Sequence, residues 1–168
     1  VLGLYNVLNA IVERYPDLLI ESCSGGGGRF DAGMLYYAPQ AWCSDNTDAI
    51  DRIKIQYGSS FGYPISSVGS HVSVCPNEQT GRTVPIETRG AVAMAGTFGY
   101  ELDLTQMNDA DKEAVKIQIE QYKKYADIIR EGQYYRITNP MENTEFAAWE
   151  FVSEEKEQAL MFYTALNS

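Results

Sequence analysis

Positive charge is scarce in this sequence. Its 168 residues include 13 lysines and arginines against 23 aspartates and glutamates, a formal net charge of -10. A chain with this balance has no electrostatic footprint for binding phosphate backbones or anionic lipid. It also has no apolar run near the roughly 20 residues needed to cross a bilayer. We therefore predict no nucleic-acid partner and no membrane role.

Cysteine is also rare. The three cysteines, Cys23, Cys43 and Cys75, are an odd number and lack the close spacing of a metal site, which indicates a reducing compartment and not a disulfide framework. The first ten residues have neither the basic start nor the small-residue cleavage site of a signal peptide. We therefore expect a cytoplasmic protein with no metal and no cofactor. Because the sequence begins at Val1 and not at a methionine, we also expect that upstream sequence is missing.

Helix and strand patterns alternate over residues 1–131. Hydrophobic residues make up 45% of the sequence and aromatic residues 12%, which is enough for a real core. Residues 18–20 read as a short buried strand that ends in Glu21-Ser22-Cys23, and residues 68–74 alternate as a strand does. The strongest helix pattern has Asp109 near its start and Gly132 just beyond its end. The alternation predicts a parallel α/β sheet with functional groups on the loops that follow its strands.

The pattern changes after Gly132. Three segments read as strands: 134–138, 146–152 and 158–166. The charged turn at 153–157 separates the last two strands. We predict a domain boundary here, with the α/β part in residues 1–131 and the start of an antiparallel β domain in residues 132–168.

Four consecutive glycines, Gly25 to Gly28, follow the predicted strand that ends in Glu21-Ser22-Cys23. Glycine lets the backbone approach a ligand closely, so one functional interpretation is a phosphate cradle. The segment lacks the Lys-Ser/Thr that ends a P-loop and the spacing of a dinucleotide fingerprint. A structural loop is therefore the favoured interpretation, and nucleotide binding is a distant alternative.

The segment 42–48 places Trp42 beside the carboxylates Asp45 and Asp48 at the end of a strand. An aromatic ring with nearby carboxylates suits sugar recognition, because a pyranose packs its apolar face on the ring. Helix capping explains the same acidic and amide residues, and the pattern alone favours it. The single histidine, His71, lies in an alternating strand, where a hydrogen-bonded structural role is the simpler interpretation.

Several of these segments together resemble a known family. The main motifs are, in order, ESCSGGGGRFD at 21–31, MLYY at 34–37, WCSDNTDA at 42–49 and IQYG at 55–58. Shorter matches are HV at 71–72, PN at 76–77, TRG at 88–90 and GYELDL at 99–104. Independent motifs in this order resemble the α-galactosidases of glycoside hydrolase family 36.

The resemblance implies a (β/α)8 (TIM) barrel followed by a C-terminal β-sandwich. Residues 1–131 would form the second half of the barrel, and residues 132–168 the first antiparallel strands of the β domain. The implied substrates carry a terminal α-1,6-linked galactose, as melibiose, raffinose and stachyose do. Intact family members are commonly oligomeric, so we expect a homo-oligomer.

The resemblance also implies roles for individual residues. Asp45 corresponds to the catalytic general acid/base, and Trp42 to an aromatic wall of the galactose pocket. Cys23, Gly25 and Gly26 correspond to contacts around the sugar. Asp48 is then left as the helix cap, and Cys43 stands where the family pattern has a threonine.

The family's nucleophile motif, an aspartate shortly after a Lys-Trp pair, has no counterpart in the sequence and is expected upstream of Val1. A retaining glycosidase needs two carboxyl groups about 5 to 5.5 Å apart, one as nucleophile and one as acid/base. We therefore expect the 168 residues alone to be inactive. We also expect them to associate, because half a barrel leaves sheet edges uncovered.

Two other functions stay open at this point. One is a related enzyme that acts on α-N-acetylgalactosamine or that transfers galactose to build raffinose-type oligosaccharides. The other is a noncatalytic carbohydrate-binding module that keeps Trp42 and the glycine run but performs no chemistry.

Overall fold

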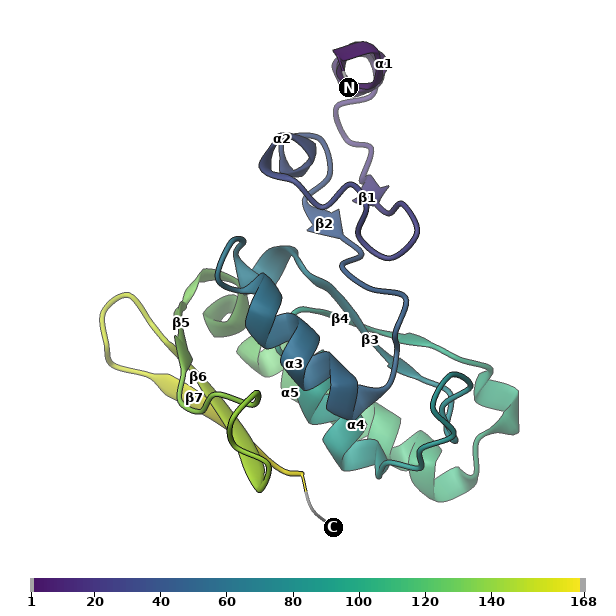
Figure 1. Ribbon diagram of the computed structural model, residues 1–168, viewed down its shortest axis with the longest axis vertical. Coiled ribbons are helices and arrows are strands. Elements are labelled where there is room, and N and C mark those ends of the chain that lie inside the picture. The colour runs from purple at the N-terminus through teal and green to yellow at the C-terminus, as the bar shows by residue number, and fades with distance from the viewer. Residues whose placement is uncertain (1, 167–168) are drawn as a thin grey trace.

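The computed structural model describes residues 2–166 of the chain (Figure 1). The α/β part consists of α1 (Leu2–Arg14), β1 (Glu21–Ser22), α2 (Ala32–Leu35), β2 (Gln40–Ala41), α3 (Ala49–Ser59), β3 (Gly69–Ser73), α4 (Ile86–Ala93), β4 (Thr97–Glu101) and α5 (Asp109–Glu131). Short 3-10 helices lie at Ile65–Ser67 and Leu104–Gln106. The chain then forms β5 (Gln133–Arg136), β6 (Phe146–Val152) and β7 (Ala159–Ala165).

The first four strands run parallel in chain order. β1 pairs with β2, and β3 pairs with β4 from Gly69 opposite Thr97 to Ser73 opposite Glu101. A single parallel bridge between Ala41 and Val68 links the two pairs. Helices fall between consecutive strands, so the predicted α/β arrangement with parallel strands is confirmed.

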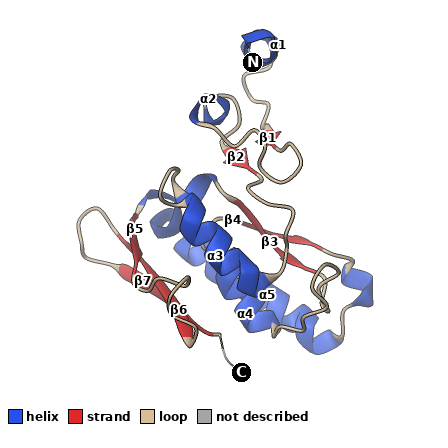
Figure 2. Cartoon of the chain, in the orientation of Figure 1, coloured by secondary structure: helices blue, strands red, loops and turns tan. Residues whose placement is uncertain are grey.

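The last three strands form an antiparallel sheet in the order β5, β6, β7. Helices α3, α4 and α5 lie between this sheet and the β3–β4 pair (Figure 2). The main core is formed by side chains from the three helices, the antiparallel sheet and the segment before β3, including Phe151 and Val68, which are both fully buried. Its buried members are Ile53, Ile65, Val68, Val92, Ala95, Ile129, Ala147, Trp149 and Phe151. The strands after Gly132 therefore share a core with the α/β part.

The helix ends follow the sequence signals. The Asp48 carboxylate accepts hydrogen bonds from the backbone N–H groups of Ile50 and Asp51 and caps α3. Asn108 caps α5 by accepting from the Asp111 N–H, and Gly132 ends that helix. The capping role expected of Asp48 and the long helix expected after Asp109 are both confirmed.

The N-terminal segment differs from its prediction. Residues 18–20 are not a strand; pairing begins only at Glu21, and the side chains of Leu18 and Leu19 are 50% and 87% exposed. The sequence of these residues resembles a buried strand because it is apolar, but no element of residues 2–166 covers their side chains. Helix α1 likewise has no buried residue, and in Figure 1 it projects with α2 away from the rest of the chain.

None of the helices within residues 2–166 is both long and apolar enough to span a membrane.

Candidate active site

The glycine run after β1 packs against the loop after β2. A Cβ added at Gly26 would lie 2.9 Å from the backbone nitrogen of Asp45 and 3.2 Å from its Cγ, and one at Gly27 would lie 2.6 Å from the Cys43 carbonyl oxygen. Both glycines also have positive φ angles, 69° and 97°, which side chains disfavour. The favoured structural interpretation of the run is thus supported, because glycine lets this loop reach Asp45.

The Asp45 carboxylate itself is exposed. Within residues 2–166, no hydrogen bond to the carboxylate oxygens is formed, and the bonds of this residue are made by its main chain. Gln79 Nε2 donates to the Asp45 carbonyl oxygen over 2.6 Å, and Gln79 Oε1 accepts from the Thr47 N–H over 3.0 Å. The carboxylate is therefore placed by the backbone of its own loop and left open to solvent.

Buried Arg52, which projects from α3 and is 5% exposed, bonds the main chain of the loop that carries Asp45. Its Nε donates to the Asn46 carbonyl oxygen over 2.7 Å, and its Nη2 donates to the Ser44 carbonyl oxygen over 2.9 Å. Burial lowers the pKa of Arg52, while Cys43 and Asp45 raise it; an arginine remains a cation in this situation. Sequence reasoning missed this residue. Its one signal was a charged residue at the buried face of a helix, one position before Ile53.

Strands β1 to β4 and the loops after β1 and β2 line an open cleft of ≈ 530 Å³. Three predicted site residues, Cys23, Trp42 and Asp45, meet in it. The other two predicted residues, Gly25 and Gly26, lie in the adjoining glycine turn and are not part of the lining. The remaining lining residues are Glu21, Gln40, Ser70, His71, Thr97, Phe98, Gly99, Tyr100 and Glu101.

Two side chains lie against the indole ring of Trp42. The His71 imidazole stacks parallel to it at 4.5 Å between ring centroids, and the Arg52 guanidinium lies 4.1 Å from its ring centroid. Burial lowers the pKa of His71, outweighing Glu101, which raises it from 3.1 Å away. His71 is therefore neutral at pH 7 and packs as an aromatic neighbour, so the face of Trp42 that it covers is closed to a sugar.

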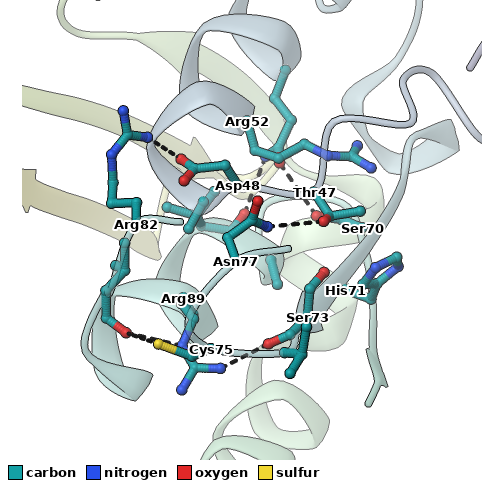
Figure 3. Close-up of a pocket in the computed structure, with 16 residues that line it drawn as sticks. Thr47, Asp48, Arg52, Ser70, His71, Ser73, Cys75, Asn77, Arg82 and Arg89 are labelled. Carbon is teal, nitrogen blue, oxygen red and sulfur yellow. Dashed lines mark hydrogen bonds and ion pairs between the residues drawn. The ribbon is translucent and has the colours of Figure 1, made fainter. Parts of the chain in front are cut away.

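A second polar cluster surrounds Asp48 behind the same loop (Figure 3). Asp48 is almost fully buried, pairs with Arg82 and accepts from the Thr80 hydroxyl over 2.7 Å. Asn77 donates to the Thr47 hydroxyl over 3.0 Å. The cavity enclosed there has a volume of ≈ 20 Å³, room for about one water molecule. This cluster is structural: it ties the loop after β3 to the start of α3.

The described part of the chain, residues 2–166, contains no group of three or more histidine, cysteine, aspartate or glutamate side chains placed to hold a metal ion.

Comparison with known proteins identifies the family. The melibiase family model matches residues 1–132. The bifunctional alpha-galactosidase/sucrose kinase AgaSK of Mediterraneibacter gnavus is 58% identical over 161 residues, covering 96% of this chain and 17% of AgaSK. The alpha-galactosidase AgaA of Geobacillus stearothermophilus is 54% identical over 162 residues, covering 96% of this chain and 22% of AgaA.

Solved structures give the same result. The galactosidase domain of AgaSK matches with a TM-score of 0.97 at 56% identity, over 100% of this chain and 23% of that chain. A Geobacillus stearothermophilus AgaA variant in complex with raffinose matches with a TM-score of 0.93 at 53% identity, over 96% of this chain and 22% of that chain. The protein belongs to the melibiase family, and its resemblance to the α-galactosidases of glycoside hydrolase family 36 is confirmed. The chain spans less than a quarter of the length of these relatives.

Proposed function

We propose that this chain is the part of a retaining α-galactosidase that supplies the general acid/base, Asp45. The observation that carries the proposal is the position of Asp45: its exposed carboxylate enters a cleft shared with Cys23 and Trp42, in a chain whose relatives are α-galactosidases. The substrates we propose are melibiose, raffinose and stachyose. Variants of AgaA have been solved in complex with raffinose and with stachyose.

The proposed reaction is a double displacement. A nucleophilic carboxylate from a segment outside these 168 residues attacks the anomeric carbon of galactose. Asp45 gives its proton to the glycosidic oxygen, so that the aglycone leaves as an alcohol. Asp45 then takes a proton from water, which attacks the anomeric carbon and breaks its bond to the nucleophilic carboxylate, so that galactose is released with its original configuration. This chemistry needs the two carboxyl groups about 5 to 5.5 Å apart.

The proposed architecture is the second half of a (β/α)8 barrel in residues 1–131 and the start of a β-sandwich domain in residues 132–168. The four parallel strands in chain order support the first part of this proposal. The loops that carry Asp45 and Gln79 both follow the C-terminal ends of strands, the edge of a barrel at which active sites are built.

The test compares the isolated chain with the full-length protein that carries it. Each is assayed on p-nitrophenyl α-D-galactoside, and the anomer first released is followed by proton NMR. We expect turnover only by the full-length protein, with α-galactose as the first product. Release of β-galactose would contradict the retaining mechanism, and binding of galactose without turnover by the full-length protein would instead indicate a carbohydrate-binding module.

A further inference from the structure

We propose that Arg52 and Gln79 form a two-sided clamp that positions Asp45 for proton transfer. This inference rests on the proposed function, since it names the residues that hold its acid/base in place. Neither side chain is a catalytic residue in this proposal. Both act on Asp45 through the main chain of the Asp45 loop, which we define as residues 43–47, and Arg52 also lies against the Trp42 ring.

The need for a clamp follows from how Asp45 is held. Within residues 2–166 the carboxylate has no hydrogen-bond partner of its own, and its side chain is exposed. Its direction therefore depends on the backbone of the Asp45 loop, which is neither helix nor strand. Proton transfer requires the acid within hydrogen-bond reach of the leaving oxygen, and a misplacement of about 1 Å can cost about 100-fold in rate.

Arg52 forms the buried side of the clamp. Its planar guanidinium donates to two carbonyl oxygens that flank Asp45, those of Ser44 at 2.9 Å and Asn46 at 2.7 Å. The two carbonyl groups belong to the residues immediately before and after Asp45, so the guanidinium fixes the chain on both sides of it. A lysine could not reproduce this, because its ammonium lacks the rigid fork of donors.

Gln79 forms the exposed side. Its amide bonds the Asp45 carbonyl oxygen and the Thr47 N–H together, at 2.6 Å and 3.0 Å. The turn that carries Gln79 is itself fixed by buried Asn77, whose Oδ1 accepts from the Gln79 N–H over 3.0 Å. Gln79, 34 positions away in sequence from Asp45, thus ties the loop after β3 to the main chain of the Asp45 loop, and Asn77 of the same loop also bonds the Thr47 hydroxyl.

The test uses the full-length protein and substrates that differ in their need for an acid. Raffinose has a poor leaving group and depends on general-acid help, whereas 2,4-dinitrophenyl α-galactoside does not. The variants are Arg52→Lys and Gln79→Ala, with Asp45→Ala as the reference for complete loss of the acid. Gln56→Met is the matched control: Gln56 lies one turn further along α3 and is also buried, but its partners are the Val92 carbonyl oxygen and the Ser70 hydroxyl, and not the Asp45 loop.

We expect Arg52→Lys to lower kcat/KM for raffinose about 10- to 100-fold more than kcat/KM for the dinitrophenyl substrate, because kcat/KM reports the first displacement, in which only raffinose needs the acid. Gln79→Ala should show the same selectivity with a smaller factor, and because Gln79 is exposed this variant tests the clamp even if Arg52→Lys folds poorly. Gln56→Met should affect both substrates equally. Equal losses on both substrates for Arg52→Lys and Gln79→Ala would overturn the proposal.

Amide hydrogen exchange separates this proposal from the proposed function. In Arg52→Lys, exchange of residues 43–47 should become at least about 10-fold faster, while Gln56→Met should leave this segment unchanged. If the wild-type protein hydrolyses no galactoside but the exchange result holds, the proposed function fails and the clamp stands. If the exchange of these residues is unchanged in both clamp variants, the clamp is wrong, whatever the activity.

Discussion

Arg82 pairs with two carboxylates, those of Asp48 and Asp51, and only the Asp48 side chain is fully buried. Burial raises the pKa of Asp48, but the Thr80 hydroxyl, the Asp51 N–H and Arg82 outweigh it, and the pKa lies below its usual value of 3.8. A carboxylate whose pKa is lower in the folded than in the unfolded chain stabilises the fold above the unfolded value. That contribution is lost as the pH falls through the folded-state pKa.

We therefore predict that Asp48→Asn lowers the free energy of unfolding by about 1 to 2 kcal/mol at pH 7. Asparagine still caps α3, so the loss reports the charge pairing with Arg82. The difference from wild type should shrink as the pH falls below 3.8 towards the folded-state pKa, so it should be smaller at pH 3 than at pH 7 when measured by urea unfolding. Asp51→Asn is the control: Asp51 lies 3.3 Å from Arg82 but is 37% exposed, so it should cost less than about 1 kcal/mol. An equal cost for the two variants would show that burial of Asp48 does not matter.

At the scale of single residues, the sequence predicts which side chains line the cleft. It does not predict the neighbouring residues that fix their positions. Cys23, Trp42 and Asp45 follow strands, and strand ends gather at one edge of a parallel sheet, so their meeting could be predicted. The stacking of His71 on Trp42 could not, because it depends on the pairing of distant strands. Arg52 was missed for the same reason, since its partners are main-chain groups that no sequence pattern marks.

Among the elements, the loops after β1, β2 and β3 matter most for the site. Gly26 has a backbone conformation with φ of 69° and almost no space at its Cβ position, which faces the Asp45 nitrogen. Gly81 has a similar φ of 71° with nothing within 4 Å of its Cβ position. Alanine at either position costs about 1 to 2 kcal/mol of backbone strain, but only at Gly26 does it also displace the Asp45 loop.

We predict that Gly26→Ala lowers kcat/KM for raffinose about 100-fold in the full-length protein, because a shift near 1 Å in the acid has that effect. Gly81→Ala, which carries the strain without the collision, should lower it less than about 10-fold. Steady-state kinetics on raffinose, measured for both variants and the wild type, test this difference. Similar losses in both would mean that backbone strain, and not contact with Asp45, is the reason for glycine at Gly26.

The regular elements could largely be predicted, because their signals are local. Caps and periodicity marked α3 and α5, and alternation marked β3 and the three C-terminal strands. The strand expected from residue 18 forms only at its end, Glu21–Ser22. Its first part was wrong because burial is a property of the whole molecule, and the leucines there are exposed within residues 2–166. The register between β3 and β4 and the bridge between Ala41 and Val68 join segments more than twenty residues apart and leave no local signal.

For the whole molecule, the exposed apolar surface near the N-terminus has a consequence. Leu2, Val7, Leu18 and Leu19 are all at least half exposed, and β1 pairs on one side only within residues 2–166. Such surfaces and strand edges promote association. We predict that the isolated 168-residue chain forms dimers or larger species in proportion to its concentration. Light scattering after size-exclusion chromatography, run at low and high concentration, tests this; a monomer at both would contradict it.

The most direct test of the assignment is the effect of Asp45→Ala in the full-length protein on two substrates. If Asp45 is the acid/base, kcat/KM for raffinose should fall by about 100- to 10,000-fold, while 2,4-dinitrophenyl α-galactoside, which needs no acid to leave, should lose far less in the same comparison. Activity on raffinose that is indifferent to this substitution, or an equal loss on both substrates, would contradict the role of Asp45.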